Sequence, residues 1–268
     1  MNAAEHHDAP QQGERSTGQT VALSAKGLSK DFRGFRAVNN VDLDVVEGQI
    51  HALVGPNGAG KTTLFNLLTG YIKPTSGTIT VHGKDITGRE PEQIAHEGVA
   101  RSFQITSLFD NLTPREHVEL GLQGMAGGGM RFWRSDKQLR QYRERADQLV
   151  DEVGLSALAD RPAGELAYGQ KRALEMALVI SLDPTVLLLD EPTAGMGRED
   201  VDRTIELVQQ IAKGRTVVFV DHNMHVVGSL AHHVTVLMAG EVLARGTYET
   251  VRADQRVINA YLGEESNA

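Results

Sequence analysis

Short apolar runs in the first third of the chain follow the pattern of β-strands. Four such runs are separated by Gly, Pro and Asn residues, and they cover residues 21–23, 41–45, 50–54 and 78–81. One helical pattern interrupts them, from Lys61 onward. We therefore expect this part of the chain to be mainly β-structure with one helix inserted.

The middle of the chain changes to a helical period, from about Gln104 to Ala173. Apolar side chains recur there at the spacing of one helix face, at Leu139, Tyr142, Ala146, Leu149 and Val153. A glycine-rich stretch, residues 124–130, precedes this helical pattern. The sequence therefore predicts an inserted helical subdomain over about residues 105–175.

Two continuous apolar runs follow, residues 186–189 and 217–220, with a helix-like span from about Arg198 to Lys213 between them. Runs without polar positions are typical of strands that are covered on both faces of a parallel sheet. The whole pattern predicts an α/β fold. Because no internal repeat is visible, we expect one domain over residues 21–263, with a disordered tail at 1–20 and a short tail at 264–268.

Composition narrows the class of protein. The chain has 268 residues, of which 40% are hydrophobic, so it can bury a full core. It contains no cysteine, which excludes disulfides and thiolate metal sites. The formal net charge of −8 gives no general attraction to nucleic acid, and none is expected as a partner. No apolar run reaches the roughly 18 residues of a membrane span, and the N-terminus lacks a signal-peptide core.

The stretch GPNGAGKTT, directly after the run 50–54, has the spacing of a phosphate-binding loop. Its glycines allow backbone N–H groups to approach an anion closely, and the helix that follows adds its positive dipole end. Lys61 is expected to reach the β- and γ-phosphates of a nucleotide, and Thr62 to offer its hydroxyl to Mg²⁺. The expected phosphate-binding residues are Gly55, Pro56, Asn57, Gly58, Ala59, Gly60, Lys61, Thr62 and Thr63.

A phosphate loop alone fits kinases, GTPases and ATPases, and a second motif narrows the choice. The run 186–189 delivers two adjacent carboxylates, Asp190 and Glu191, at the carboxyl end of a predicted strand. Ligands of open α/β sheets bind at that end of the strands. We expect Asp190 to serve the Mg²⁺ shell and Glu191 to orient or activate the attacking water.

The stretch Leu166-Ala167-Tyr168-Gly169-Gln170 resembles the LSGGQ signature of ATP-binding cassette (ABC) proteins, and it precedes the Asp-Glu strand by the interval typical of that family. The resemblance covers residues 21–263. It implies a P-loop ABC ATPase fold with an antiparallel β subdomain, a RecA-like core and an inserted helical subdomain. It also implies that Phe32 stacks on adenine, that Gln104 contacts Mg²⁺ and takes part in catalysis, and that His222 is the histidine switch.

Further stretches, residues 98–104, 192–196 and 257–263, look like the ATPase subunits of branched-chain amino acid importers, a branch shared with urea and short-amide importers. The resemblance implies two ATPase subunits that enclose two ATP molecules head to tail. Each ATP then touches one chain's phosphate loop and the other chain's Ala167, Tyr168, Gly169 and Gln170. It further implies two membrane-spanning permease subunits, an indirect link to a solute-binding protein, and a place on the cytoplasmic face of the inner membrane.

Two positions depart from the general ABC pattern. Ala167 replaces the signature serine, and the loop 194–197 lacks the usual aspartate. Because both segments face the shared ATP sites in the family, the two sites need not be equivalent. A heterodimer with a second, related ATPase subunit is therefore as consistent with the sequence as a homodimer.

Two other functions remain open at this point. One is an ATPase of the lipopolysaccharide-export type, which also resembles residues 221–223 and the C-terminal end of this chain but usually has an LSGG-type signature. The other is an ABC protein without a transporter, acting as a nucleotide-dependent binding module. Phe132 and Trp133 are candidates for contact with membrane subunits, whereas the pair His232 and His233 is expected at the surface or at a strand edge.

Overall fold

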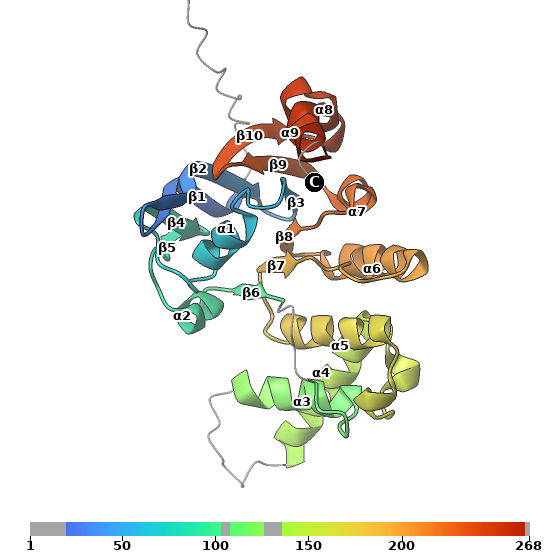
Figure 1. Cartoon of the computed structure of the whole chain (residues 1–268). Helices are drawn as coiled ribbons and strands as arrows, with labels where there is room; N and C mark the ends of the chain where they lie inside the picture. Colours follow the sequence, from blue (N-terminus) through green and yellow to red (C-terminus); the bar gives the residue numbers. More distant parts are fainter. Residues whose placement is uncertain (1–19, 103–107, 126–135, 266–268) are drawn as a thin grey trace, which may run out of the picture.

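The computed structural model describes residues 20–102, 108–125 and 136–265, and within these ranges it places the strands in two sheets (Figure 1). The first sheet is antiparallel and has the strand order β2-β1-β4-β5. Its strands are β1 (Val21–Phe32), β2 (Phe35–Val46), β4 (Ser76–Val81) and β5 (Lys84–Asp85). This sheet is the antiparallel subdomain that the resemblance implies.

The second sheet has six strands in the order β10-β9-β3-β8-β7-β6. Its strands are β3 (Ile50–Val54), β6 (Val99–Arg101), β7 (Val186–Asp190), β8 (Thr216–Val220), β9 (His233–Met238) and β10 (Glu241–Gly246). All neighbouring pairs are parallel except β9 and β10, which form an antiparallel pair at the edge. The strand β3, although early in the chain, lies between the late strands β8 and β9.

Helices cover the six-stranded sheet and also form a separate lobe. The helices are α1 (Lys61–Leu68), α2 (Pro91–His96), α3 (Pro114–Met125), α4 (Asp136–Glu152), α5 (Tyr168–Ile180), α6 (Arg198–Ile211), α7 (Met224–Leu230), α8 (Tyr248–Ala253) and α9 (Gln255–Glu265), with two short 3₁₀ turns, Ser156–Leu158 and Ala163–Glu165. Figure 1 shows α3, α4 and α5 grouped in a lobe at the lower end of the molecule, away from β1 and β2. Within the described ranges, no helix is long and apolar enough to cross a bilayer.

The alternating side chains of the central strands divide the core in two. Ala52 and Val54 of β3 pack with apolar residues of α5, α6 and α7, whereas Leu53 packs with α1 and the antiparallel sheet. Side chains point to opposite faces along a strand, so a strand that is covered on both faces must be apolar at every position. This explains why the runs at β3, β7 and β8 carry no polar-apolar alternation.

The predicted central strands and the start of α1 at Lys61 are confirmed. The prediction for β1 was too short, because this strand continues past residue 23 to Phe32. Its pairing with β2 shifts register between Ala25 and Leu28, which breaks the regular alternation. At the other end of the chain, α9 extends to Glu265 and so enters the expected tail. The boundaries 105–175 for the helical subdomain stay a prediction, and α5 continues beyond them to Ile180.

Candidate functional site

The glycine-rich stretch forms the turn between β3 and α1, and two of its glycines are required by their surroundings. Gly55 has φ +150°, and a Cβ there would lie 2.2 Å from the carbonyl oxygen of Leu237. Gly60 has φ +99°, and a Cβ would lie 2.5 Å from the carbonyl oxygen of Ala37. The loop is therefore held against the end of β9 and the start of β2 by contacts that only glycine permits.

The end of this loop has the features of an anion site. No side chain caps the N-terminus of α1, and its first turn carries no acidic residue. Lys61 is buried, and its Nζ donates to the carbonyl oxygens of Gly55 (2.6 Å) and Pro56 (2.8 Å). Thr62 is exposed and Thr63 half-buried. A lysine inside a backbone loop at an uncapped helix N-terminus fits the phosphates of a nucleotide.

Asp190 ends β7 in a buried ion pair that the sequence did not reveal. Its Oδ2 lies 2.5 Å from Nη2 of Arg101 on β6, and the two side chains are only 7% and 12% exposed. Arg101 also donates through Nη1 to Oδ1 of Asn66 on α1, at 2.6 Å. The guanidinium thus connects the helix after the phosphate loop to the carboxylate expected in the Mg²⁺ shell. The one signal in the sequence was a lone arginine at the end of a short apolar strand.

Glu191 and His222 lie in contact, a pairing that the sequence analysis did not predict. His222 Nε2 is 2.9 Å from Glu191 Oε1, and this contact joins the residues that follow β7 and β8. Glu191 has φ +48°, in the left-handed region that residues with a Cβ seldom adopt. Such a conformation costs about 1–3 kcal/mol and is found mainly where the surrounding structure imposes it at functional sites. The conformational propensity of glutamate does not predict this left-handed backbone.

A second pair of residues, missed by the sequence analysis, holds the same two loops. Thr193 donates through Oγ1 to Oδ2 of Asp221 at 2.6 Å, and both side chains are buried. The other oxygen of Asp221 accepts from the backbone N–H of Asn223 at 2.9 Å. Thr193 and Asp221 therefore fix the loop after β7 against the turn that carries His222.

The signature stretch forms the start of α5. Ala167 is the N-cap residue, and its backbone N–H donates to Oε1 of Gln170 at 3.0 Å. Tyr168 is exposed and Gly169 half-buried, and the Tyr168 hydroxyl donates to the carbonyl oxygen of Ala194 at 3.2 Å. Figure 1 shows α5 in the helical lobe and α1 beside the antiparallel sheet, so a single chain does not bring these two helix starts together.

The remaining predicted residues are placed less centrally or lie outside the described ranges. Phe32 ends β1, is 42% exposed, and has Lys30 Nζ 5.2 Å from its ring centroid. Gln104 lies outside the described residues, as do Phe132 and Trp133. His233 begins β9, and both it and His232 are exposed.

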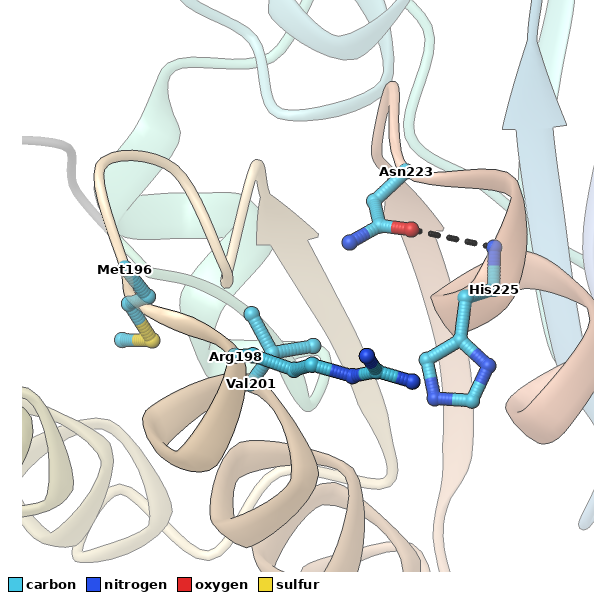
Figure 2. Close-up of a pocket in the computed structure, with 5 residues that line it drawn as sticks. All are labelled: Met196, Arg198, Val201, Asn223 and His225. Carbon is cyan, nitrogen blue, oxygen red and sulfur yellow. Dashed lines mark hydrogen bonds between the residues drawn. The ribbon is translucent and has the colours of Figure 1, made fainter.

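A pocket of about 490 Å³ lies beside these loops. It is lined by Met196, Arg198, Val201, Asn223 and His225. Figure 2 shows the Arg198 side chain extending toward the ring of His225, while Asn223 Oδ1 accepts from the His225 backbone N–H at 3.0 Å. Over residues 20–102, 108–125 and 136–265, no three His, Asp or Glu side chains gather as metal ligands.

A phosphate loop between a parallel strand and a helix, with acidic residues at the end of a nearby strand, defines a P-loop nucleotide-binding protein. Comparison with known proteins makes this more specific. The family model described as ABC transporter matches residues 38–194, and one described as branched-chain amino acid ATP-binding cassette transporter matches residues 241–267. The chain belongs to the ABC transporter ATP-binding family, in the branch of the branched-chain amino acid cassettes.

Individual relatives agree with this assignment. The chain is 40% identical over 252 residues to the high-affinity branched-chain amino acid transport ATP-binding protein BraF of Pseudomonas aeruginosa, covering 90% of this chain and 98% of that protein. It is 38% identical over 250 residues to LivG of Escherichia coli, a protein of the same description, with the same two coverages. The ADP conformation of an ATP-binding cassette of an ABC transporter superposes with a TM-score of 0.80 at 28% identity, covering 91% of this chain and 99% of that one.

Proposed function

We propose that this chain binds ATP with Mg²⁺ and hydrolyses it as the ATP-binding subunit of an importer for branched-chain amino acids or related small polar solutes. One observation carries the proposal. The strands β3, β8 and β7 are parallel neighbours, and directly after their carboxyl ends come the phosphate loop, His222, and Glu191 after Asp190. Three separate parts of the sequence thus supply one edge of the sheet with the groups that ATP hydrolysis needs.

Each group has its own role in this proposal. Backbone N–H groups of the phosphate loop and the N-terminus of α1 bind the phosphates, and Lys61 neutralises their charge. Thr62 and Asp190 hold Mg²⁺, with Gln104 as a further contact, and this ion neutralises charge that develops on the phosphates. Glu191 orients or deprotonates the attacking water, and His222 fixes the Glu191 carboxylate through the 2.9 Å contact.

The signature acts in a dimer. In a head-to-tail pair, the start of α5 faces the ATP that is bound to the other chain's phosphate loop. The residues that face it are Ala167, Tyr168, Gly169 and Gln170. Phe32 stacks on the adenine ring of a bound ATP. Support comes from the exposure of Ala167, Tyr168 and Phe32, which leaves these side chains accessible to a second molecule. The second molecule is another copy of this chain or a related ATPase subunit.

The partners of the dimer are two membrane-spanning permease subunits, with a solute-binding protein contacting them from the other side and no nucleic acid involved. The dimer then lies on the cytoplasmic face of the inner membrane. Exposed apolar side chains on the helical lobe support this arrangement, because Phe109 and Leu120 are 64% and 51% exposed. Purification of the chain from its native membrane is expected to recover permease subunits and an amino-acid-binding protein, and identification of a different set would reject the importer.

Two variants test the ATPase. Lys61→Ala is expected to abolish tight binding of Mg-ATP in calorimetry, because it removes the ammonium that the loop positions. Glu191→Gln is expected to keep binding but to slow hydrolysis by roughly 10²–10⁴-fold, the usual effect of a positioned acid-base group. The control is Lys213→Ala, an exposed lysine in the turn that follows the C-terminal end of α6. Unchanged ATP affinity in the Lys61 variant, or unchanged turnover in the Glu191 variant, would reject the assignment of that residue.

A further inference from the structure

The Tyr168 hydroxyl connects two segments that lie far apart in the sequence. It donates to the carbonyl oxygen of Ala194 at 3.2 Å, so the first residue of α5 is tied to the loop 194–197 that follows β7. The ring itself is 60% exposed, so the hydroxyl is held by this contact without burial of the side chain. In the general ABC signature this position is a glycine, which has no side chain for such a contact.

The same junction is closely packed at neighbouring positions. A Cβ on Gly169 would lie 3.2 Å from Oδ1 of Asp200, so the starts of α5 and α6 approach each other directly. On the other side of the loop, Oγ1 of Thr204 on α6 lies 3.2 Å from the sulfur of Met196. The loop 194–197 is therefore held between Tyr168 and α6.

From Ala194 the contacts continue to the proposed catalytic base. The backbone N–H of Ala194 donates to the carbonyl oxygen of Glu191 at 3.1 Å, which closes a tight turn. Glu191 holds its left-handed backbone conformation at the start of this turn, and its carboxylate contacts His222. A displacement of Ala194 therefore changes the position of Glu191, the proposed catalytic base.

We propose that Tyr168 is a positioning residue, which transmits the placement of the signature to Glu191 of the same chain. This inference rests on the proposed function and adds a route between the two ATP sites. The signature faces the partner's nucleotide, and Glu191 serves the nucleotide of its own chain. When the start of α5 contacts the partner's ATP, its position fixes, through Tyr168, the position of the turn 191–194 beside the ATP of its own chain.

The test uses Tyr168→Phe, which keeps the ring and removes only the hydroxyl. Its matched control is Tyr248→Phe, on α8 in the C-terminal part of the chain. The first measurement is amide hydrogen exchange in the full chain without nucleotide. It follows the backbone N–H groups of Ala194 and Met196, which donate to the carbonyl oxygens of Glu191 and Thr193. We expect their exchange to become about two- to tenfold faster in Tyr168→Phe, the usual effect of one lost hydrogen bond, and to be unchanged in the control.

Steady-state ATPase kinetics of the assembled protein give the second readout. The turnover number is expected to fall by a similar factor of about two to ten, with KM for ATP unchanged, because the hydroxyl positions Glu191 and does not hold the nucleotide. Raised KM with unchanged kcat would show a direct contact with the partner's ATP and overturn the proposal. Wild-type exchange at residues 194 and 196, or wild-type turnover, would overturn it equally. ATP binding and hydrolysis by the wild-type chain are measured first. A wild-type chain that neither binds nor hydrolyses ATP would reject the proposed function, independently of the result for Tyr168→Phe.

Discussion

At the scale of single residues, Arg101 is the cation of a buried ion pair. Its guanidinium is nearly buried between the carboxylate of Asp190 and the side-chain oxygen of Asn66, and it lies 5.7 Å from the ring centroids of Phe65 and Tyr71. Removal of one partner from a buried ion pair leaves an uncompensated charge. Arg101 is therefore required for the fold around β7 as well as for the placement of Asp190.

Arg101→Met is expected to lower the free energy of unfolding by about 3–5 kcal/mol, because Asp190 then stays buried without a counter-charge. The measurement is urea unfolding of the single variant, of Asp190→Asn and of the double variant. The second substitution is expected to recover most of the loss, since it removes the unpaired charge. A single variant within about 1 kcal/mol of the wild type would show that water reaches the carboxylate.

The phosphate loop and the acidic pair were predictable from sequence because their chemistry fixes residue type and spacing. Lys61, Asp190 and Glu191 all follow directly from local patterns. The left-handed backbone of Glu191 and the ion pair of Asp190 with Arg101 were not predictable in this way. Both depend on partners far away in the sequence, Val220 for the Glu191 backbone N–H and Arg101 for Asp190, which local propensity does not describe.

At the scale of elements, the start of α5 lacks a side-chain cap. Ala167 has φ −64° and ψ 160°, the extended conformation that capping serines adopt, and Gln170 already accepts from its backbone N–H. A serine at this position would complete a capping box, because its oxygen can accept from the amide three residues on. The backbone at the start of α5 thus has the conformation of a serine N-cap, although the residue there is alanine.

Ala167→Ser is expected to raise the free energy of unfolding by about 1 kcal/mol through this cap. The hydroxyl keeps its hydrogen for the partner's γ-phosphate, so the ATP-bound dimer should tighten by about 10- to 100-fold. Urea unfolding measures the first effect, and ultracentrifugation in a Glu191→Gln background measures the second.

The control for the cap is Ala95→Ser in the last turn of α2, away from its N-cap, where serine is expected to be neutral or unfavourable. Equal stability changes at residues 95 and 167 would show that the start of α5 gains nothing from a cap. An unchanged dimer affinity would mean that backbone donors already satisfy the phosphate.

The elements themselves were predicted unevenly, and the reason is physical. Strands covered on both faces, such as β7 and β8, show as uninterrupted apolar runs and were found. The long strand β1 carries polar residues such as Lys26 and Lys30 on its more exposed positions and shifts its register, so only its first residues were recognised. The edge strand β10 has only one buried position, and no apolar pattern marked it.

At the scale of the whole molecule, one buried histidine makes stability depend on pH. His51 in β3 is 4% exposed, and its Nε2 lies 2.9 Å from Oγ1 of Thr235 on β9. The pKa of His51 is lowered to about 3, mainly by burial and to a lesser extent by the charges of the nearby His233 and Arg245. The folded chain therefore keeps this ring neutral, whereas the unfolded chain protonates it near pH 6.5.

Because the unfolded state binds this proton first, stability is complete above about pH 6.5 and falls as the pH drops toward 3. His51 alone accounts for a loss of about 2 kcal/mol between pH 7 and pH 5. We expect His51→Gln to lack this part of the acid dependence, so its stability relative to the wild type should improve by that amount at pH 5. His96→Gln, on the exposed face of α2, is the control. Parallel stability curves for wild type and His51→Gln would contradict the prediction.

The position of β3 in the middle of its sheet has a consequence for synthesis of the protein. The stretch 55–63 leaves the ribosome early, but its supports come late: β8 ends at Val220, and the carbonyl against which Gly55 rests belongs to Leu237. A nascent chain therefore lacks the backbone against which Gly55 packs until residue 237 has been added. During synthesis the phosphate loop therefore stays without these neighbours until β8 and β9 have both been made.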